Sequence, residues 1–356
     1  MNPFDYVRPA SVSEAVAAGA APGAVFLAGG TNLVDLMKGG IVRPSRLVDV
    51  SRLPGLDRIE RLPDGSLRIG ALVRNADLAH DPDFAGSHPA VAEALLSGAS
   101  AQLRNAATVA GNLLQRTRCA YFFDPASACN KRQPGEGCDA RGGENRQHAV
   151  IGWSEHCIAT HPSDFCVPLV ALDAVVEIAG AAGPRAVPLE AFHRLPDSAP
   201  DRETVLEPGE LVTALRLPAQ AAAFAGHSRY LKLRERTSYA FAVVSAAAAL
   251  RLDGGRIAEA RIALGGVALK PWRERAAEDL LVGAAPNPEA FARAGKAVLA
   301  AASPSGENAF KIGLARRLVA RALARAALGT PARLPALPGS VLVPAPGEIA
   351  GEITHA

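Results

Sequence analysis

The stretch Ala24-Val25-Phe26-Leu27-Ala28-Gly29-Gly30-Thr31-Asn32 decides the fold of the N-terminal part of this chain. Its first five residues form a continuous apolar run, which is typical of a buried strand, and the run stops at two glycines. Paired glycines let successive backbone N–H groups approach a phosphate, and residues 33–37 can wind into a helical turn whose positive end faces the same place. A diphosphate fits this pattern, but Gly-Gly-Thr-Asn is also typical of an ordinary turn. The G-x-G-x-x-G spacing of the dinucleotide fingerprint is absent.

The residues on either side of this stretch predict one βαβ unit. Ser11 and Glu14 form a capping box, so a short helix is expected to start there. Residues 47–50, Leu-Val-Asp-Val, supply another strand. We therefore expect a first structural unit over residues 1–55.

A second glycine-containing motif follows about eighty residues later. Residues 100–105, Ser-Ala-Gln-Leu-Arg-Asn, precede residues 108–112, Thr-Val-Ala-Gly-Asn. Small residues with hydroxyl and amide groups suit close contact between backbone and a phosphate or a flat ring. The same residues are also typical of a polar helix cap and turn, so it is the pair of motifs together that favours a large nucleotide.

The remaining sequence predicts two further regions and a tail. A region over residues 56–220 contains a strand at 67–70 and a helix at 89–98. A region over residues 221–328 contains a strand at 230–233, a hairpin around Asp253-Gly254-Gly255, and amphipathic helices at 288–302 and 307–328. Repeated prolines predict that residues 329–356 form an extended tail, either disordered or laid over a neighbour.

Composition excludes several classes of protein. A chain of 356 residues that is 49% hydrophobic and 21% charged can bury substantial cores in two or three domains. Its formal charge of +3 is too small for a nucleic-acid surface. The N-terminus lacks a basic segment followed by an apolar one, and no run of about 18 apolar residues occurs, so we expect neither a signal peptide nor a membrane span.

Four of the five cysteines crowd into one loop, residues 116–160, which is rich in Gly, Pro, Asn and Arg; they are Cys119, Cys129, Cys138 and Cys157. A loop this long inside a compact domain is usually functional or disordered, and four thiolates on one ion or cluster would order it. Spacings of nine, eight and eighteen intervening residues match neither common zinc modules nor ferredoxin runs. The spacing of the cysteines therefore does not identify the metal, and structural zinc stays an alternative.

Other residues near this loop have more than one interpretation. His148, His156 and His161 lie close enough in sequence to replace a thiolate, although each is also typical of a polar surface or a cap. Cys166 falls outside the pattern in an apolar stretch, and we expect it to be a small buried residue. Six cations could offset the negative charge of a cluster, lie in solvent or meet an acidic partner; they are Arg116, Arg118, Lys131, Arg132, Arg141 and Arg146.

Residues 1 to about 328 resemble the FAD-binding medium subunits of the molybdenum hydroxylases, and within them the aldehyde oxidoreductase branch. The resemblance is carried by Gly-Gly-Thr-Asn-Leu (29–33), Gly-Asn-Leu-Leu-Gln-Arg-Thr-Arg-Cys (111–119) and Ala-Leu-Gly-Gly-Val-Ala-Leu-Lys-Pro-Trp (263–272). Ser163-Asp164-Phe165 and Tyr230-Leu231-Lys232-Leu233 add to it. It implies an α+β fold, with a vanillyl-alcohol-oxidase-like FAD domain of two α/β subdomains and a C-terminal domain of a three-stranded antiparallel sheet and helices.

The resemblance also implies roles for individual residues in binding FAD. The segment that wraps the diphosphate would be Phe26, Leu27, Ala28, Gly29, Gly30, Thr31, Asn32, Leu33 and Val34. Thr108, Gly111 and Asn112 would lie against the ribityl and diphosphate region, Asp164 would bind the cofactor, Lys232 would lie near the flavin, and Val212 would touch the flavin or adenine. A carboxylate can accept hydrogen bonds from ribityl hydroxyls, and an ammonium can stabilise negative charge on a reduced flavin.

For the cysteine loop the resemblance implies a [4Fe-4S] cluster with Cys119, Cys129, Cys138 and Cys157 as ligands. It further implies a molybdopterin-containing large subunit that oxidises the aldehyde and a small [2Fe-2S] subunit that passes electrons to FAD, from which they go to an external acceptor. No substrate-oxidising acid, base or nucleophile is expected in this chain. Relatives reach the periplasm by co-export with a partner, so periplasm and cytoplasm both stay open.

Two other functions stay open at this stage. A stand-alone flavoprotein oxidoreductase could use the same fold. A zinc-stabilised interaction subunit would explain the thiols but would leave both glycine motifs as mere turns.

Overall fold

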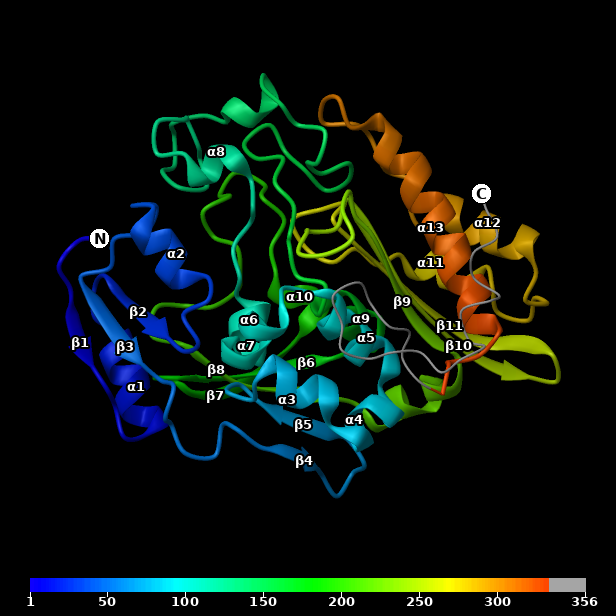
Figure 1. Ribbon diagram of the computed structural model, residues 1–356, viewed down its shortest axis with the longest axis horizontal. Helices are drawn as coiled ribbons and strands as arrows, with labels where there is room; N and C mark the ends of the chain where they lie inside the picture. The colour runs from blue at the N-terminus through cyan, green and yellow to red at the C-terminus, as the bar shows by residue number, and fades with distance from the viewer. Residues whose placement is uncertain (333–356) are drawn as a thin grey trace.

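The computed structural model describes residues 1–332, and the predicted tail lies outside the described residues from residue 333 onward. Within residues 1–332, no helix is both long enough and apolar enough to cross a membrane. Three sheets succeed one another along the chain, and Figure 1 shows them side by side.

The first sheet is small and entirely parallel, with strand order β1-β3-β2. Its elements are β1 (Asp5–Val7), α1 (Val12–Gly19), β2 (Ala24–Leu27), α2 (Leu33–Lys38) and β3 (Arg46–Asp49). The predicted N-cap is confirmed, because Ser11 Oγ accepts from Glu14 N at 3.2 Å. Glu14 Oε2 accepts from Ala10 N at 2.9 Å, one residue before the N-cap, so the second bond of the predicted capping box is shifted by one residue.

The apolar run at residues 24–27 forms a strand, but it is not the buried strand that its composition predicts. β2 lies at the edge of the sheet and all four of its residues are half-buried, whereas Val48 in the central strand is fully buried. The run is apolar because it packs on α1. A Cβ added at Gly19 would lie 2.3 Å from the Phe26 ring, so the helix and the strand approach closely.

The second sheet has five antiparallel strands in the order β4-β5-β8-β6-β7. Its strands are β4 (Ile59–Arg61), β5 (Leu67–Gly70), β6 (Val175–Gly180), β7 (Gly183–Pro188) and β8 (Leu211–Leu217). The helical elements between them are α3 (Asn75–His80), α4 (Pro82–Ser87), α5 (Pro89–Ser97), α6 (Ala101–Ala106), α7 (Val109–Leu113), α8 (Ala120–Phe123), η1 (Asp139–Arg141), α9 (Cys166–Ala171) and α10 (Leu189–Phe192). The main core lies here, with Ile69, Val91 and Phe165 completely buried.

The third sheet is the predicted three-stranded antiparallel one, in the order β11-β10-β9. Its elements are η2 (Ala219–His227), β9 (Ser228–Leu233), β10 (Val244–Asp253), β11 (Arg256–Gly265), α11 (Arg275–Asp279), α12 (Pro288–Ala297) and α13 (Ala309–Ala327). The predicted hairpin and both helices are confirmed. In Figure 1 the long helix α13 runs along β9 and β10 and begins near the loop that carries α8.

The start of α13 anchors the cysteine loop. Lys311 is fully buried and its ammonium donates to the carbonyls of Gln147, His148 and Gly266 at 2.7–2.8 Å. Asn308, also fully buried, donates to the carbonyls of His148 and Ala149 at 3.2 and 3.0 Å. Buried backbone carbonyls need such partners, so these two side chains fix the end of the loop against the C-terminal domain.

Acid should destabilise the fold partly through His88. This side chain is 3% exposed, and burial, aided by the charge of Arg61, lowers its pKa to about 4. Between the unfolded value of about 6.5 and about 4, the unfolded chain binds a proton that the folded chain does not, so stability falls as the pH falls through this window. Between pH 7 and pH 4.5 the free energy of unfolding should fall by on the order of 2–3 kcal/mol less in His88→Gln than in the wild type. Urea unfolding at the two pH values measures this difference.

The matched control is His80→Gln, because His80 is exposed. It should follow the wild-type pH dependence, and an H88Q curve that also does so would contradict the assignment.

Candidate functional site

The two glycine motifs, far apart in sequence, touch each other in the structure. A Cβ added at Gly29 would lie 2.0 Å from the carbonyl oxygen of Ala106, which lies between the two parts of the second motif, residues 100–105 and 108–112. Gly30 has a φ of +70°, a conformation that favours glycine. The first glycine is therefore required by close approach and the second by backbone conformation.

The second motif forms the start of α7. Thr108 Oγ1 accepts from Gly111 N at 3.2 Å, and Asn112 Oδ1 accepts from Ser163 Oγ at 2.7 Å. The cap and turn expected from the sequence are thus present. The hydrogen bond from Ser163 also joins this motif to the segment that carries Asp164.

A cavity of about 590 Å³ lies beside these motifs. Six of the predicted cofactor residues line it, namely Thr31, Asn32, Gly111, Asn112, Asp164 and Lys232. A cavity of this size with convergent polar groups is typical of a cofactor site.

Asp164 and Lys232 form a buried ion pair at the wall of the cavity. The Lys232 ammonium donates to Asp164 Oδ2 at 2.8 Å and to the carbonyl of Ser97 at 3.1 Å. The other carboxylate oxygen of Asp164 accepts from the Tyr230 hydroxyl at 2.5 Å. The side chains of Asp164 and Lys232 are only 7% and 5% exposed. Because water cannot solvate them, the two charges depend on each other and on these hydrogen bonds.

Other predicted cofactor residues do not line the cavity. The lining residues do not include Phe26, Leu27, Ala28, Gly29, Gly30, Leu33, Val34 and Thr108. Val212 is 2% exposed in β8 and packs in the main core. Its contact with FAD stays a prediction.

Several residues of the cavity wall were not predicted to line a cofactor site, although Arg118 was recognised as a cation near the cysteine loop. Arg118 lies over the rings of Phe123 and Phe241, at 6.0 and 5.0 Å from their centroids. Tyr239 and Phe241 line the cavity and are about half exposed, and Tyr239 has a φ of +49°. Tyr239 and Phe241 could have been recognised from the sequence, because two aromatic residues in a polar loop directly after a strand are unusual.

A second cavity, of about 520 Å³, adjoins the first and reaches the cysteine loop. Arg118, Asp164 and Phe241 line both cavities. The second is also lined by Cys119 and His148. The cysteine loop and the predicted flavin pocket are therefore neighbours in space.

The four loop cysteines converge. All four line one small cavity, together with residues that include Lys131 and His156. Cys129 and Cys138 face each other across an antiparallel bridge. Burial raises the pKa of Cys119 to about 12 and also raises those of Cys138 and Cys157, so a bound metal would have to displace thiol protons.

The sequence left open whether the six cations near the loop face a cluster, solvent or a partner, and five of them pair with carboxylates of this chain. Lys131, which is fully buried, binds Glu203 Oε1 at 2.9 Å, and Arg116 binds the same carboxylate at 3.1 Å. Although burial raises the pKa of Glu203, these two cations outweigh it and hold that pKa below its ordinary value. Arg132, Arg141 and Arg146 pair with Glu136, Glu155 and Glu235.

Of the three candidate histidines, His148 contacts one of the four loop cysteines. Its Nε2 lies 3.2 Å from Cys119 Sγ, and its Nδ1 is buried with no hydrogen-bond partner. Burial, aided by the charge of Lys311, lowers the pKa of His148 to about 4. The ring is therefore neutral near pH 7, and Nε2–H can donate to a Cys119 thiolate.

The other two candidate histidines lie elsewhere. His156 lines the small cavity of the cysteines and its carbonyl accepts from Asn130. His161 lies beside His193, with ring centroids 4.4 Å apart, and lines the second cavity together with Cys119.

Two protein families match nearly the whole chain. Residues 2–220 match the family described as "FAD binding domain in molybdopterin dehydrogenase", and residues 229–326 match the "CO dehydrogenase flavoprotein C-terminal domain". The chain therefore belongs to the FAD-binding medium-subunit family of the molybdenum hydroxylases. It is an FAD-binding oxidoreductase subunit with the fold that the resemblance implied.

Individual relatives agree with this assignment. The chain is 50% identical to the aldehyde oxidoreductase FAD-binding subunit of Escherichia coli K12, over 92% of this chain and 99% of the relative. It is 28% identical to the carbon monoxide dehydrogenase medium chain of Hydrogenophaga pseudoflava, over 90% and 96%. A solved structure of reconstituted CO dehydrogenase from Oligotropha carboxidovorans is similar with a TM-score of 0.73 at 26% identity, over 93% of this chain and 100% of that one.

The contact between the two glycine motifs can be tested with Gly29→Ala. The added methyl cannot coexist with the Ala106 carbonyl at 2.0 Å, so the motifs must separate. We expect a loss of roughly 1–3 kcal/mol of stability, as for other overpacked sites, together with weaker FAD retention on gel filtration. Gly86→Ala is the control, since nothing lies within 4 Å of a Cβ there. Equal stability and FAD content in the two variants would refute the proposed contact.

Proposed function

We propose that this protein is the FAD-binding electron-transfer subunit of a molybdenum-dependent aldehyde oxidoreductase. A partner [2Fe-2S] subunit would deliver electrons to it, a molybdopterin-containing large subunit would oxidise the aldehyde, and an external acceptor would take the electrons away. The observation that carries the proposal is the 50% identity, over 92% of this chain, to a relative named as an aldehyde oxidoreductase FAD-binding subunit.

FAD would occupy the cavity of about 590 Å³ beside the glycine motifs. The diphosphate would lie at residues 26–34 and at Thr108, Gly111 and Asn112, where the glycines keep side chains out of the way. Asp164 would accept from cofactor hydroxyls, and Lys232 would lie near the flavin, with Val212 behind. A bound flavin supplies the chemistry that accepts electrons singly and passes on one or two.

The role of this chain's own residues is to bind and orient. Lys232 is fixed by two acceptors, so its positive charge stays at one point of the cavity wall. A fixed cation favours negative charge that develops next to it. Arg118, Tyr239 and Phe241 would limit the access of water to the same region.

The cysteine loop would hold a [4Fe-4S] cluster on Cys119, Cys129, Cys138 and Cys157. Four converging thiols in a small buried cavity are the ligand set that such a cluster needs. A single tetrahedral zinc with Zn–S bonds of about 2.3 Å would draw its sulfurs to about 3.8 Å from one another. Among residues 1–332, three ligand atoms within 4.8 Å of one another occur at His161, Cys166 and His193, and not within the cysteine set. The wider spacing favours a cluster over one ion.

His148 and Lys131 would stabilise the negative charge of the thiolate ligands of this cluster. A hydrogen bond from His148 Nε2 to Cys119 Sγ would stabilise the thiolate, and the Lys131 ammonium lowers the pKa of Cys157 against the effect of burial. Both residues would favour the reduced, more negative state of the cluster.

The compartment would be the periplasm, reached with a partner, or the cytoplasm. The structural units would be residues 1–55, 56–220 and 221–328.

The main test is the visible spectrum of the purified protein with analysis of iron, sulfide, zinc and flavin. The proposal expects one FAD, four iron atoms and four sulfides per chain, and copurification with two further subunits. Zinc without iron or flavin would refute it, and a fully active protein without partners would favour a stand-alone flavoprotein.

Cys138→Ser tests the cluster separately. Because Cys138 is the more exposed end of the bridge with Cys129, the exchange should leave the chain folded. We expect iron and sulfide to fall by more than half while FAD stays at one per chain. Cys166→Ala should change neither iron nor FAD, and an unchanged iron content in C138S would exclude Cys138 as a ligand.

Lys232→Met tests the ion pair beside the flavin. It leaves Asp164 charged and unpaired in a buried position, so we expect a loss of roughly 3–5 kcal/mol of stability, measured by urea unfolding. The double variant Asp164→Asn with Lys232→Met removes both charges and should recover most of that stability. FAD affinity, measured by flavin fluorescence on dilution, should stay weakened in both. Recovered FAD affinity in the double variant would show that the pair has only a structural role.

A further inference from the structure

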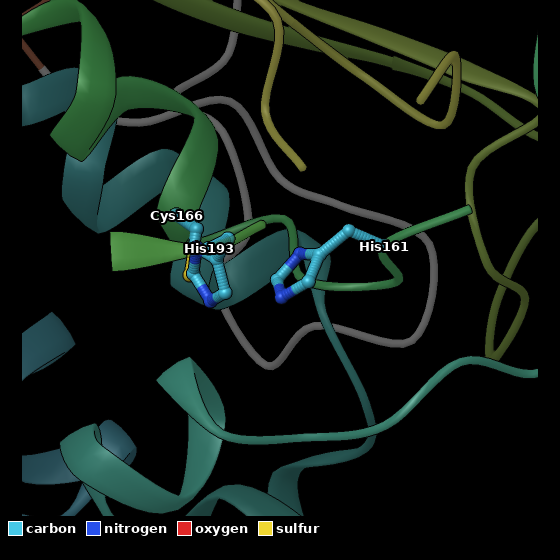
Figure 2. A group of neighbouring side chains, drawn as sticks. All are labelled: His161, Cys166 and His193. Carbon is cyan, nitrogen blue, oxygen red and sulfur yellow. The ribbon is translucent and has the colours of Figure 1, made fainter. Parts of the chain in front are cut away.

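Two histidines and a cysteine converge at a place that neither the flavin nor the four clustered thiols use. Figure 2 shows the imidazole of His161 extending toward His193, with Cys166 beside His193. One ligand atom from each residue lies within 4.8 Å of the other two. The three residues are 8%, 4% and 0% exposed, so the site is shielded from bulk solvent.

The two imidazoles have unused nitrogen atoms. His161 Nε2 and His193 Nδ1 are buried and have no hydrogen-bond partner. Buried polar atoms of this kind are rare and require an explanation. A cavity of about 20 Å³ lies next to both rings.

The hydrogen bonds of His193 fix its tautomer for ligation. Its Nε2 lies 3.0 Å from the carbonyl of Leu113, which can only accept, so Nε2 carries the proton and the lone pair of Nδ1 faces the site. A histidine that donates its second N–H to a backbone carbonyl is the usual arrangement at a metal.

His161 needs one small adjustment. Its Nδ1 accepts from Ser163 N at 3.4 Å, the long limit of a hydrogen bond, which places the proton on Nε2. Ligation requires that proton to move to Nδ1, at the expense of this weak contact.

We propose that His161, Cys166 and His193 form a buried binding site for a thiophilic d10 ion, and that the ion is Cu(I). Thiolate and imidazole are ligands that suit both Cu(I) and Zn(II). On binding, the ion forms a bond to Cys166 Sγ and the thiol proton leaves to solvent. No electron transfer accompanies this step.

Charge decides between the two ions. Cu(I) with one thiolate and two neutral imidazoles sums to zero, whereas Zn(II) leaves one positive charge in a buried site. The nearby carboxylates cannot neutralise it, because Asp164 is bound to Lys232 and Glu203 is bound to Lys131 and Arg116. An uncompensated buried charge is costly, so the monovalent ion is favoured.

The position suggests a structural role. His161 belongs to the segment that leaves the cysteine loop, Cys166 begins α9, and His193 follows α10. An ion there would join the exit of the loop to the core of the second sheet. This site is independent of the flavin and of the cluster.

The test is anaerobic titration of the purified complex with Cu(I) and, separately, Zn(II), each against a competing chelator. His193→Gln can keep a donor for the Leu113 carbonyl while it removes the Nδ1 ligand, and His80→Gln is the matched control on an exposed histidine. We expect one Cu(I) per wild-type and H80Q chain. In H193Q the affinity should fall by more than the roughly 10–100-fold typical for loss of an outer hydrogen-bond partner.

X-ray absorption at the copper edge should show one sulfur and two nitrogen ligands, and FAD and iron contents should be equal in wild type and H193Q. If H193Q does not fold, Cys166→Ala gives the same comparison. Zinc in place of copper would support the site and overturn the choice of ion. Equal binding by wild type, H193Q and C166A would overturn the site itself and leave a hydrogen bond or one trapped water between the two rings. Loss of iron or FAD from the wild type would count against the proposed function and not against this site.

Discussion

The buried ion pair between Asp164 and Lys232 is the interaction on which the cofactor region depends. It joins the segment before α9 to β9, and so connects the five-stranded sheet region to the C-terminal sheet. The Tyr230 hydroxyl and the Ser97 carbonyl complete its hydrogen bonds. Because both charges are withdrawn from water, neither is stable without the other. Any shift between the two regions would therefore disturb the wall of the flavin cavity.

Buried polar side chains also hold the cysteine loop in place. Residues 116–160 form few regular elements, yet the loop is held by buried donors at defined points. Lys311 and Asn308 bind the carbonyls near its end, and Lys131 joins its middle to Glu203. Asn130 Oδ1 accepts from two glycine amides and closes the turn between Cys129 and Cys138. These contacts hold the backbone of the loop, and the four thiols line one small cavity, which is the arrangement expected of a loop completed by a metal.

Local signals predicted much of the fold. The N-cap at Ser11, the Asp253-Gly254-Gly255 hairpin and the amphipathic helices near the C-terminus were all recognised, since each depends on residues a few positions apart. The sheet formed by β5, β8 and β6 was not, because Leu67–Gly70 pairs with a strand about 145 residues further on. The edge position of β2 was also missed, since an apolar run looks the same whether a sheet or a helix covers it.

The sequence by itself determined the chemistry of the protein: two glycine motifs that suit a phosphate-bearing cofactor, and four cysteines gathered in one loop. These are properties of residue type and short spacing. Only the tertiary structure brought Gly29 against Ala106, Asp164 against Lys232, and His161 against His193 and Cys166. Apart from His161 and Cys166, these residues are tens of positions apart, and the contacts follow from how three sheets and their helices pack, a long-range outcome that no local pattern encodes.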